Sequence, residues 1–355
     1  MLFQKRTNIT TSKTGLALGS TTNFELTREF MLEGLMVRVD FNLATVAATM
    51  GPDGLHNIVK RIQLKTADGS QNRIVVDVSG PGLLEYNRQV NSGTTLDYWK
   101  YRITGATVAT GNYTLYFPIH FAHPQIADPL GSAFLLPANR FNNNPEVIVT
   151  LASQSEIDIN GTPTFALNAS NATVSIVEWR RRVDIPDFAT LNWELAESEV
   201  PYASAGRAEY ELPVPGAYTG LLLRSYTSAS ARGDLTLSTG TFPQQSLGEF
   251  RIESLGQVIR RFRLPDLQAE NQLSNADLEW AAVEGINGFY LDFLTDRFGG
   301  QVRELGSVLE TNLLAGTGSR FRLIGDINGG TGVKMKYLHH RIFGNIADFK
   351  MKLAA

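Results

Sequence analysis

The sequence predicts an all-β protein made of two tandem β-sandwich domains that share one plan. Three observations lead to this prediction. Apolar and polar residues alternate through many short segments, turn residues separate these segments, and the order of the segments repeats once along the chain. The chain has 355 residues, whereas a single hydrophobic core usually stops growing at roughly 250–300 residues. Two domains are therefore expected.

The strand pattern is clearest at residues 35–43, where every odd position is apolar and most even positions are polar. A period of two turns one side of a strand toward a core and the other toward solvent. Residues 113–121, 147–151 and 333–337 show the same alternation. Segments rich in glycine, proline, asparagine and aspartate separate the runs, as chain reversals require. These segments are residues 51–54, 67–70, 142–145 and 328–330.

Helical periodicity is scarce, which argues against a parallel sheet with crossover helices. Residues 186–199 begin with proline and an acidic residue, as helices often do, so we expect a short helical linker over residues 185–199. Short helices are also expected within residues 80–90 and 274–283.

The two halves of the chain contain similar segments in the same order. The matched pairs are 34–38 with 220–224, 59–64 with 259–264, 113–117 with 289–293, 147–151 with 321–324, and 174–182 with 333–341. Their separation is that of a whole domain and not of a solenoid repeat, so they indicate a duplicated domain. The expected boundaries are an N-terminal arm at 1–24, a first sandwich at 25–184, the linker at 185–199, a second sandwich at 200–346 and a tail at 347–355.

Composition limits the classes of function. The net charge is -3, so no basic excess predicts nucleic-acid binding. Cysteine is absent, which excludes disulfides, cysteine-ligated metals and thiol nucleophiles. Charged residues make up 19% of the chain, below the average of about 25%, which favours a surface partly covered by other subunits. No run of 18 apolar residues predicts a transmembrane helix, and the first residues lack the apolar segment of a signal peptide.

The sequence predicts no catalytic, cofactor or metal site. It contains neither a Gly-x-Ser-x-Gly nor a His-Glu-x-x-His motif. Residues 325–330 have the glycine spacing of a phosphate-binding loop, but Thr331 stands where such a loop has lysine. His339 and His340 are adjacent on a predicted strand, so they should point to opposite faces instead of converging on a metal ion. We therefore expect a protein that is not an enzyme.

Arg180, Arg181 and Arg182 form the densest basic run in the sequence. One interpretation is a solvated strand end that leads into the linker. The other is a contact between subunits, in which these arginines pair with acidic residues of a neighbouring chain. The acidic candidates are Glu194, Glu197 and Glu199. The sequence leaves both interpretations open.

Residues 1–24 form a polar arm in this interpretation, because threonine, serine, asparagine and glycine dominate them and no acidic residue occurs there. Such a segment buries little apolar surface and should not pack in a sandwich core. It is either a frayed terminus or an arm on the inner face of an assembly, where Lys5, Arg6 and Lys13 would meet a neighbour or an anionic membrane. In both cases, deleting residues 1–20 should leave the melting temperature nearly unchanged.

Residues 33–41 place a glycine before an alternating strand, which is followed by a Gly-Pro turn at 51–55 and a basic strand at 58–62. This order, with the duplication and the polar arm, resembles the double jelly-roll major capsid proteins of tailless, internal-membrane (tectivirus-like) bacteriophages, of the adenovirus-type capsid lineage. The resemblance covers nearly the whole chain and rests on no short diagnostic motif. It implies two tandem eight-stranded jelly-roll β-sandwiches joined by a short helical linker.

The resemblance also implies a function. The chain would be a viral major capsid protein whose homotrimers form pseudo-hexameric capsomers and tile an icosahedral shell. Its expected partners are further copies of the chain, penton and minor capsid proteins, and the lipid of an internal membrane. Its expected location is the virion capsid, with assembly in the host cell cytoplasm.

Two other classes of function stay open from the residues alone. A two-domain β-sandwich can be a glycan- or receptor-binding protein of the spike or lectin type, and an aromatic content of 10% would permit stacking on sugars. It can also be a glycosidase, which needs two carboxylates that converge in a cleft. The sequence singles out no such pair.

Overall fold

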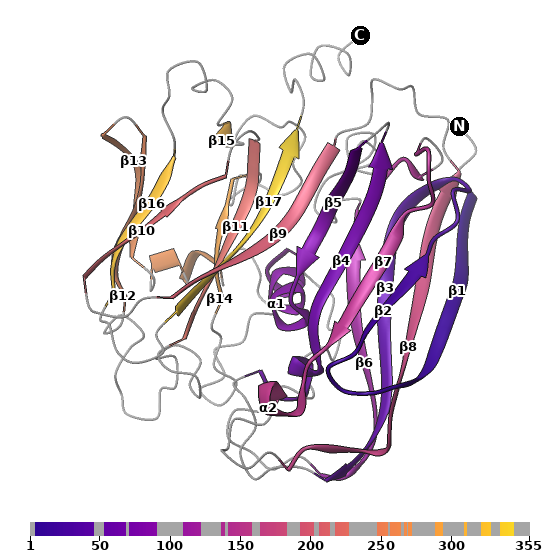
Figure 1. The fold of residues 1–355 in the computed structure, drawn as a ribbon. Helices are drawn as coiled ribbons and strands as arrows, with labels where there is room; N and C mark the ends of the chain where they lie inside the picture. The colour runs from indigo at the N-terminus through magenta and orange to yellow at the C-terminus, as the bar shows by residue number, and fades with distance from the viewer. Residues whose placement is uncertain are drawn as a thin grey trace.

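The computed structural model shows two β-sandwiches that stand side by side (Figure 1). The structure describes residues 4–45, 53–68, 71–90, 109–121, 136–138, 141–157, 164–182, 192–201, 206–213, 217–226, 247–254, 256–263, 266–267, 269–271, 288–293, 309–310, 321–327 and 334–343. Strands make up most of these residues, as the alternation of the sequence predicts.

The first sandwich is a jelly roll. Its strands are β1 (Gln4–Leu16), β2 (Thr21–Glu25), β3 (Met31–Thr45), β4 (Val59–Asp68), β5 (Gln71–Val78), β6 (Gly111–His120), β7 (Glu146–Leu151) and β8 (Ala166–Arg182). They form two sheets, in the orders β1-β8-β3-β6 and β5-β4-β7-β2. Strand β1 pairs with β8, β2 with β7, β3 with β6 and β4 with β5, all antiparallel. This nested pairing is that of a long hairpin rolled into two sheets.

The second sandwich repeats this topology. Its strands are β9 (Asn192–Pro201), β10 (Gly206–Glu211), β11 (Ala217–Tyr226), β12 (Leu247–Ser254), β13 (Gln257–Arg263), β14 (Gly288–Asp292), β16 (Arg322–Ile327) and β17 (Lys334–Phe343), with the short β15 (Leu309–Glu310) beside β11. Strand β9 pairs with β17, β10 with β16, β11 with β14 and β12 with β13. The prediction of two tandem eight-stranded jelly rolls is therefore confirmed.

The shared topology makes each strand of the first copy the counterpart of one strand in the second. Four of the five sequence matches fall on counterparts, namely β3 with β11, β6 with β14, β7 with β16, and β8 with β17. The fifth is wrong, because residues 59–64 lie on β4 whereas residues 259–263 lie on β13, the counterpart of β5. Adjacent apolar strands with basic residues are similar enough to be exchanged in such a comparison.

Two glycines occupy the same place in the two copies, Gly34 on β3 and Gly220 on β11, and each lies beside a shift in strand register. A Cβ atom at Gly34 would lie 2.8 Å from the ring of Trp179, and one at Gly220 would overlap the ring of Tyr290. In both copies an aromatic side chain fills the space that a Cβ atom would need. Glycine is therefore required for packing at this position of the repeat.

The structure corrects the expected N-terminal arm. Residues 4–16 form β1, which pairs with β8 from Gln4 opposite Arg182 to Leu16 opposite Ala172, and residues 21–25 form β2. These are the first two strands of the jelly roll. The arm prediction relied on the small apolar content of the segment, but an edge strand is held largely by its backbone hydrogen bonds and needs little burial.

The structure also corrects the expected linker. Residues 192–199 belong to β9, the first strand of the second jelly roll, while residues 186–191 lie outside the described residues. Leucine, alanine and glutamate favour a helix in isolation, but Trp193 and Leu195 have the period of a strand and are buried. Pairing with β17 on one side and β5 on the other overrides the local helix propensity.

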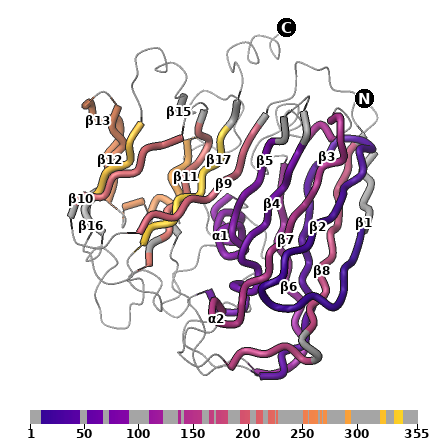
Figure 2. Tube along the Cα trace, viewed as in Figure 1, coloured from indigo at the N-terminus to yellow at the C-terminus, as the bar shows by residue number. Residues whose placement is uncertain are grey.

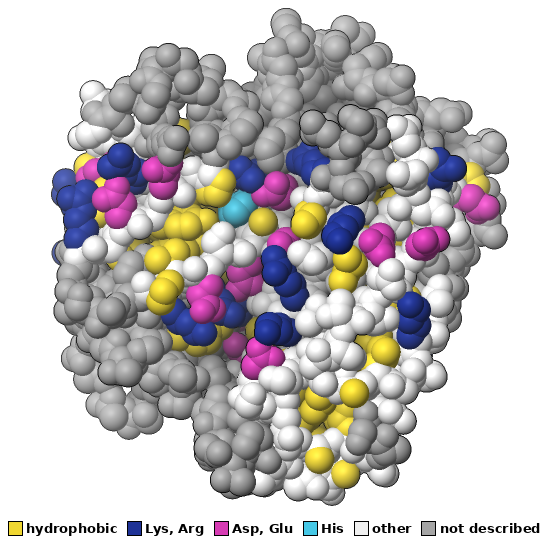
Figure 3. Space-filling view, in the orientation of Figure 1, with side chains coloured by type: hydrophobic (Ala, Val, Ile, Leu, Met, Phe, Trp, Pro, Cys, Tyr) yellow, Lys and Arg dark blue, Asp and Glu magenta, His cyan; other side chains and the backbone are white. Residues whose placement is uncertain are grey.

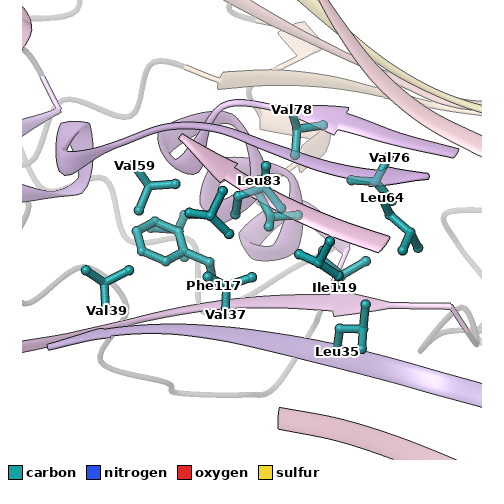
Figure 4. Packing of buried hydrophobic residues seen from close by; sticks show 14 of the residues in the cluster. Leu35, Val37, Val39, Val59, Leu64, Val76, Val78, Leu83, Phe117 and Ile119 are labelled. Atoms are coloured by element: carbon teal, nitrogen blue, oxygen red, sulfur yellow. The ribbon is translucent and has the colours of Figure 1, made fainter. Parts of the chain in front are cut away.

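The core of the first sandwich lies between its two sheets. Alternate residues of β3 and β6 point inward and meet those of β4 and β5, and a side chain of the helix α1 (Gly80–Val90) lies among them (Figure 4). Figure 4 labels Leu35, Val37, Val39, Val59, Leu64, Val76, Val78, Leu83, Phe117 and Ile119. A second core cluster fills the other sandwich and includes Phe250, Phe289 and Tyr337.

The helices are short, as expected. The predicted helix at residues 80–90 is confirmed as α1, whereas residues 274–283 lie outside the described residues. The other short elements are the 3-10 helix η1 (Gly54–Ile58) and α2 (Gln154–Ile157). Helix α1 contacts β4 and β6 of the first sandwich and β14 of the second, so it lies where the two sandwiches meet.

Deleting residues 1–16 should lower the melting temperature of the protein, because it removes β1 and leaves the outer edge of β8 unpaired. We expect a decrease of at least about 4 °C, since about 1 kcal/mol shifts the melting temperature of a domain of this size by about 2–4 °C. Differential scanning calorimetry provides the measurement. Deletion of residues 1–3, which lie before β1, is the matched control, and an unchanged melting temperature for both variants would restore the arm interpretation.

Candidate functional site

The two sandwiches are joined by one parallel strand pair. Strand β5 of the first sandwich lies beside β9 of the second, with Val76 opposite Leu195 and Asp77 opposite Ala196. The pair merges one sheet from each sandwich into a continuous nine-stranded sheet, in which β9 and β5 run next to each other at the centre (Figure 2). The junction between the sandwiches is therefore part of the hydrogen-bonded sheet.

The apolar core continues across this junction. Trp193, Leu195 and Leu222 of the second sandwich belong to the core cluster of the first. The rings of Phe121 and Trp193 lie 5.1 Å apart, and those of Tyr86 and Tyr290 lie 6.0 Å apart in an edge-to-face arrangement. Aromatic contacts of this kind add about 0.5–1.5 kcal/mol to the gain from burial. The core of the first jelly roll thus extends across the junction onto residues of the second.

A buried ion pair lies inside the junction. Arg224 of β11 is 0% exposed and its guanidinium donates hydrogen bonds to Glu197 of β9 and, at 3.1 Å, to the hydroxyl of Ser79. Ser79, at the end of β5, donates to Oε2 of Glu197 from its backbone N–H at 2.9 Å and from its hydroxyl at 2.6 Å. A Cβ atom at Gly82 would lie 2.5 Å from the same carboxylate oxygen, so only glycine fits there.

The charges of this pair stabilise each other. Burial alone would raise the pKa of Glu197, but the nearby Arg224 guanidinium outweighs this effect, and the pKa lies below its ordinary value. Burial alone would lower the pKa of Arg224, but the carboxylate of Glu197 raises it above its ordinary value. Both groups are therefore charged at neutral pH. A second link between the sandwiches is the hydroxyl of Tyr226, which donates to Asp53 Oδ2 at 3.1 Å.

Acidic residues of β9 pair with basic residues of β17 along the same sheet. Glu194 accepts a hydrogen bond from Arg341, and its carboxylate lies 3.3 Å from His339 Nε2. Glu199 lies 3.2 Å from the ammonium of Lys334 and 3.5 Å from that of Lys336. On the face shown in Figure 3, the acidic and basic side chains that are coloured are interspersed instead of forming a patch of one sign.

The pKa of the Glu194 carboxyl is strongly shifted. Burial alone would raise its pKa, but hydrogen bonds from His339 and Arg341 and the charge of Arg341 lower the pKa to about 2. Burial lowers the pKa of His339 below its ordinary value, so the histidine is neutral at pH 7. Arg341 is therefore the cation that holds Glu194 ionised.

The basic run at the end of β8 is an interior feature of the first sandwich. Arg180 is 0% exposed, pairs with Glu178 of its own strand and donates to the backbone carbonyl of Thr27 at 2.5 Å. Arg181 pairs with Glu33 at 2.6 Å, and the backbone of Arg182 lies opposite Gln4 of β1. Neither interpretation of the sequence holds for Arg180, which is neither solvated nor available to another subunit. The signal that could have found the acidic partner is the period of a strand, which puts Glu178 and Arg180 on the same face.

The three cations of the expected arm lie on β1. Lys5 and Arg6 are opposite Arg181 and Arg180 of β8. The ammonium of Lys13 lies 3.4 Å from Asn23 Oδ1 and 5.4 Å from the centre of the Phe24 ring. Lys13 therefore contacts the body of the sandwich.

The acidic residues considered as possible partners of the arginine run pair with other side chains. Glu194, Glu197 and Glu199 all lie on β9 and meet cations of β11 and β17 within the same chain. Sequence reasoning missed this network because it placed these residues on a helix. The signal that could have found it is the alternation of Trp193 and Leu195 with acidic residues.

The histidines form no metal centre in the described part of the chain, where no group of three or more suitable side chains is placed to hold an ion. His339 and His340 are both buried, and the ring of His340 contacts Tyr86, Trp193 and the hydroxyl of Thr219. Among the described residues, no helix is both long and apolar enough to cross a membrane.

Replacing Glu197 with glutamine should destabilise the protein by about 3–5 kcal/mol, because Arg224 would stay buried without its counter-charge. The double variant Glu197→Gln/Arg224→Met should recover most of this loss, since it removes both buried charges. Urea unfolding at pH 7 measures both values. Glu199→Gln is the control, because that side chain is 44% exposed and should change stability by less than about 0.5 kcal/mol. Equal effects at positions 197 and 199 would contradict the account of the junction.

The stability that Glu194 contributes should depend on pH. The pKa of its carboxyl is about 2 in the folded state and 4.5 in the ordinary state, so the contribution is complete above about pH 4.5 and is lost as the pH falls toward 2. The difference in unfolding free energy between the wild type and Glu194→Gln should therefore be largest at pH 7 and small near pH 2. Urea unfolding across this range measures it. A difference that stays constant would show that the ion pair is not responsible.

Comparison with known proteins confirms the fold. The sequence matches no protein-family model and no curated protein. In three dimensions, the major capsid protein of Sulfolobus Turreted Icosahedral Virus superimposes with a TM-score of 0.66 at 17% identity over 98% of both chains. VP54 of PBCV-1 gives a TM-score of 0.62 at 12% identity, over 96% of this chain and 94% of that one.

A bacteriophage protein extends the comparison. The major capsid protein P2 of bacteriophage PM2 superimposes with a TM-score of 0.50 at 12% identity, over 94% of this chain and 99% of that one. In each case the superposition spans both sandwiches and nearly the full length of both proteins. The chain has the double jelly-roll fold of these viral major capsid proteins.

Proposed function

We propose that this chain is the major capsid protein of a virus and that its role is structural, not catalytic. The observation that carries the proposal is the full-length superposition on viral major capsid proteins, which includes both jelly rolls and their order. The rigid junction supports it as well. Two sandwiches that are joined by one continuous sheet, and whose junction is packed by apolar residues of both, form a single block, as a shell component requires.

We further propose that three copies assemble into a pseudo-hexameric capsomer. Each chain contributes two sandwiches of the same topology, so a homotrimer presents six similar blocks around its axis. Such a particle fills a lattice position of sixfold outline with only three chains. A duplicated domain is the simplest route to this shape, because a single jelly roll would need six chains for the same outline.

The proposed location is the virion capsid, with assembly in the cytoplasm of the host cell. The proposed partners are further copies of the chain, then penton and minor capsid proteins, and the lipid of an internal membrane. No specific nucleic-acid binding is proposed, since the net charge of -3 offers no general attraction to phosphate.

The purified chain should form a homotrimer that is stable at micromolar concentration, with an interface above roughly 2,000 Å², as obligate oligomers have. Size-exclusion chromatography with multi-angle light scattering measures the mass, and electron microscopy of the peak should show particles of hexagonal outline. A monomer at micromolar concentration, with no larger species, would contradict the proposal.

A further inference from the structure

The strands β5 and β9, which join the two sandwiches, each have a counterpart in the other jelly roll. Among the described residues, these two counterparts are not paired with each other. Strand β13 is the counterpart of β5, and β1 is the counterpart of β9. They lie at opposite sides of the molecule (Figure 1). Among the described residues, β13 is hydrogen-bonded only to β12, and β1 only to β8. Each therefore has one edge without a strand partner in the described part of the chain.

Strand β13 exposes apolar side chains in a position that is covered on β5. Val258 is 39% exposed and Ile259 is 49% exposed. Val76 of β5, which lies opposite Leu195 of β9, is 0% exposed. Adjacent apolar residues on an open edge are a template for strand addition.

The register of the sheets identifies the part of β1 that corresponds to the covered part of β9. Gly34 lies opposite Trp179 of β8, and its equivalent Gly220 lies opposite His340 of β17. Trp179 and His340 are therefore counterparts. Trp179 also lies opposite Thr7 of β1, and His340 lies opposite Leu195 of β9. Thr7 is therefore the counterpart of Leu195.

The same comparison identifies the corresponding part of β13. We align β7 with β16 as in the sequence matches. The pairing of these strands with β4 and β12, and of β4 and β12 with β5 and β13, then makes Arg260 the counterpart of Val78. Because β13 has a register shift between Arg260 and Val258, the pairing makes Val258 the counterpart of Asp77 and Gln257 the counterpart of Val76. The exposed apolar pair on β13 thus lies at the place where β9 covers β5.

We propose that β13 of one copy of the chain binds β1 of a second copy as a parallel strand, with Gln257 beside Thr7. The inference rests on the proposed function and extends it by naming the contact between subunits. The contact is head-to-tail, since it joins two different surfaces. Repeated three times, it closes a ring in which β5·β9 junctions within chains alternate with β13·β1 junctions between chains.

Cysteine cross-linking tests the register, because the natural chain contains no cysteine. The double variant Thr7→Cys/Gln257→Cys should form disulfides between copies on oxidation, since adjacent strands bring Cα atoms within the range of about 4.4–6.8 Å that a disulfide needs. Denaturing electrophoresis should show linked dimers and trimers and nothing larger, because the ring closes at three. The matched control is Thr14→Cys/Gln257→Cys, which moves one cysteine seven residues, or about 23 Å, along β1.

A surface variant tests the same contact without a covalent bond. Ile259→Lys should shift the midpoint of trimer dissociation to at least tenfold higher protein concentration, whereas Tyr116→Lys should not change it. Tyr116 is a matched control because it is 42% exposed and lies on β6, away from both edges. Dilution followed by mass photometry measures the midpoint, and circular dichroism confirms that both variants are folded.

The outcomes separate this inference from the proposed function. Trimers that form normally but resist cross-linking at positions 7 and 257, or that tolerate Ile259→Lys, would overturn the strand contact and leave the capsid proposal standing. Linked chains longer than three would also overturn it, since the contact would then form an open filament. A chain that is monomeric under all conditions would overturn both.

Discussion

The parallel pairing of β5 with β9 is the interaction on which the rest of this structure depends. Two jelly rolls joined only by a linker would move independently, as domains with small interfaces do. Here the backbone of one continues the sheet of the other, and apolar residues of both pack over the same strands. The ion pair of Glu197 and Arg224 fixes the junction more specifically, because each charge is tolerated in the interior only beside the other.

This junction also gives a physical meaning to the duplication. In each copy, the strand that opens the jelly roll and the fifth strand lie at opposite edges of the sandwich. Within the chain, the fifth strand of the first copy, β5, pairs with the opening strand of the second copy, β9. The other two, β1 and β13, leave a complementary pair of edges at the two ends of the molecule, and a block with complementary ends is suited to a closed ring. The symmetry of the proposed capsomer therefore follows from the same pairing that holds the chain together.

Much of the fold could be predicted from the sequence. Alternation located the strands β3, β6, β7 and β17, and the repeat located the counterparts of most of them. The first strand of each copy was not found in this way, although Trp193 and Leu195 of β9 alternate with polar residues. Strand β1 is too polar to show a buried face, and β9 is composed of residues that favour a helix. Both are specified by the long-range pairing with β8 and β17, which a local pattern does not record.

The candidate site was harder to predict than the fold. Arg180 stood out as part of a basic run, yet its role depends on Glu178 and on carbonyl groups about 150 residues earlier. The acidic residues of β9 were noticed but were assigned to the wrong element and the wrong partners. Charge partners across a sheet depend on register, and register became available only with the three-dimensional arrangement of the strands.

Electron cryomicroscopy of the purified assembly, at a resolution that separates strands, tests the central claim most directly. The account predicts a ring of six jelly rolls in which one kind of edge-to-edge sheet contact recurs within and between chains, so that each sheet at a junction runs continuously from one sandwich into the next. A ring whose chains meet through other strands, or an assembly in which the two jelly rolls of a chain separate, would contradict it.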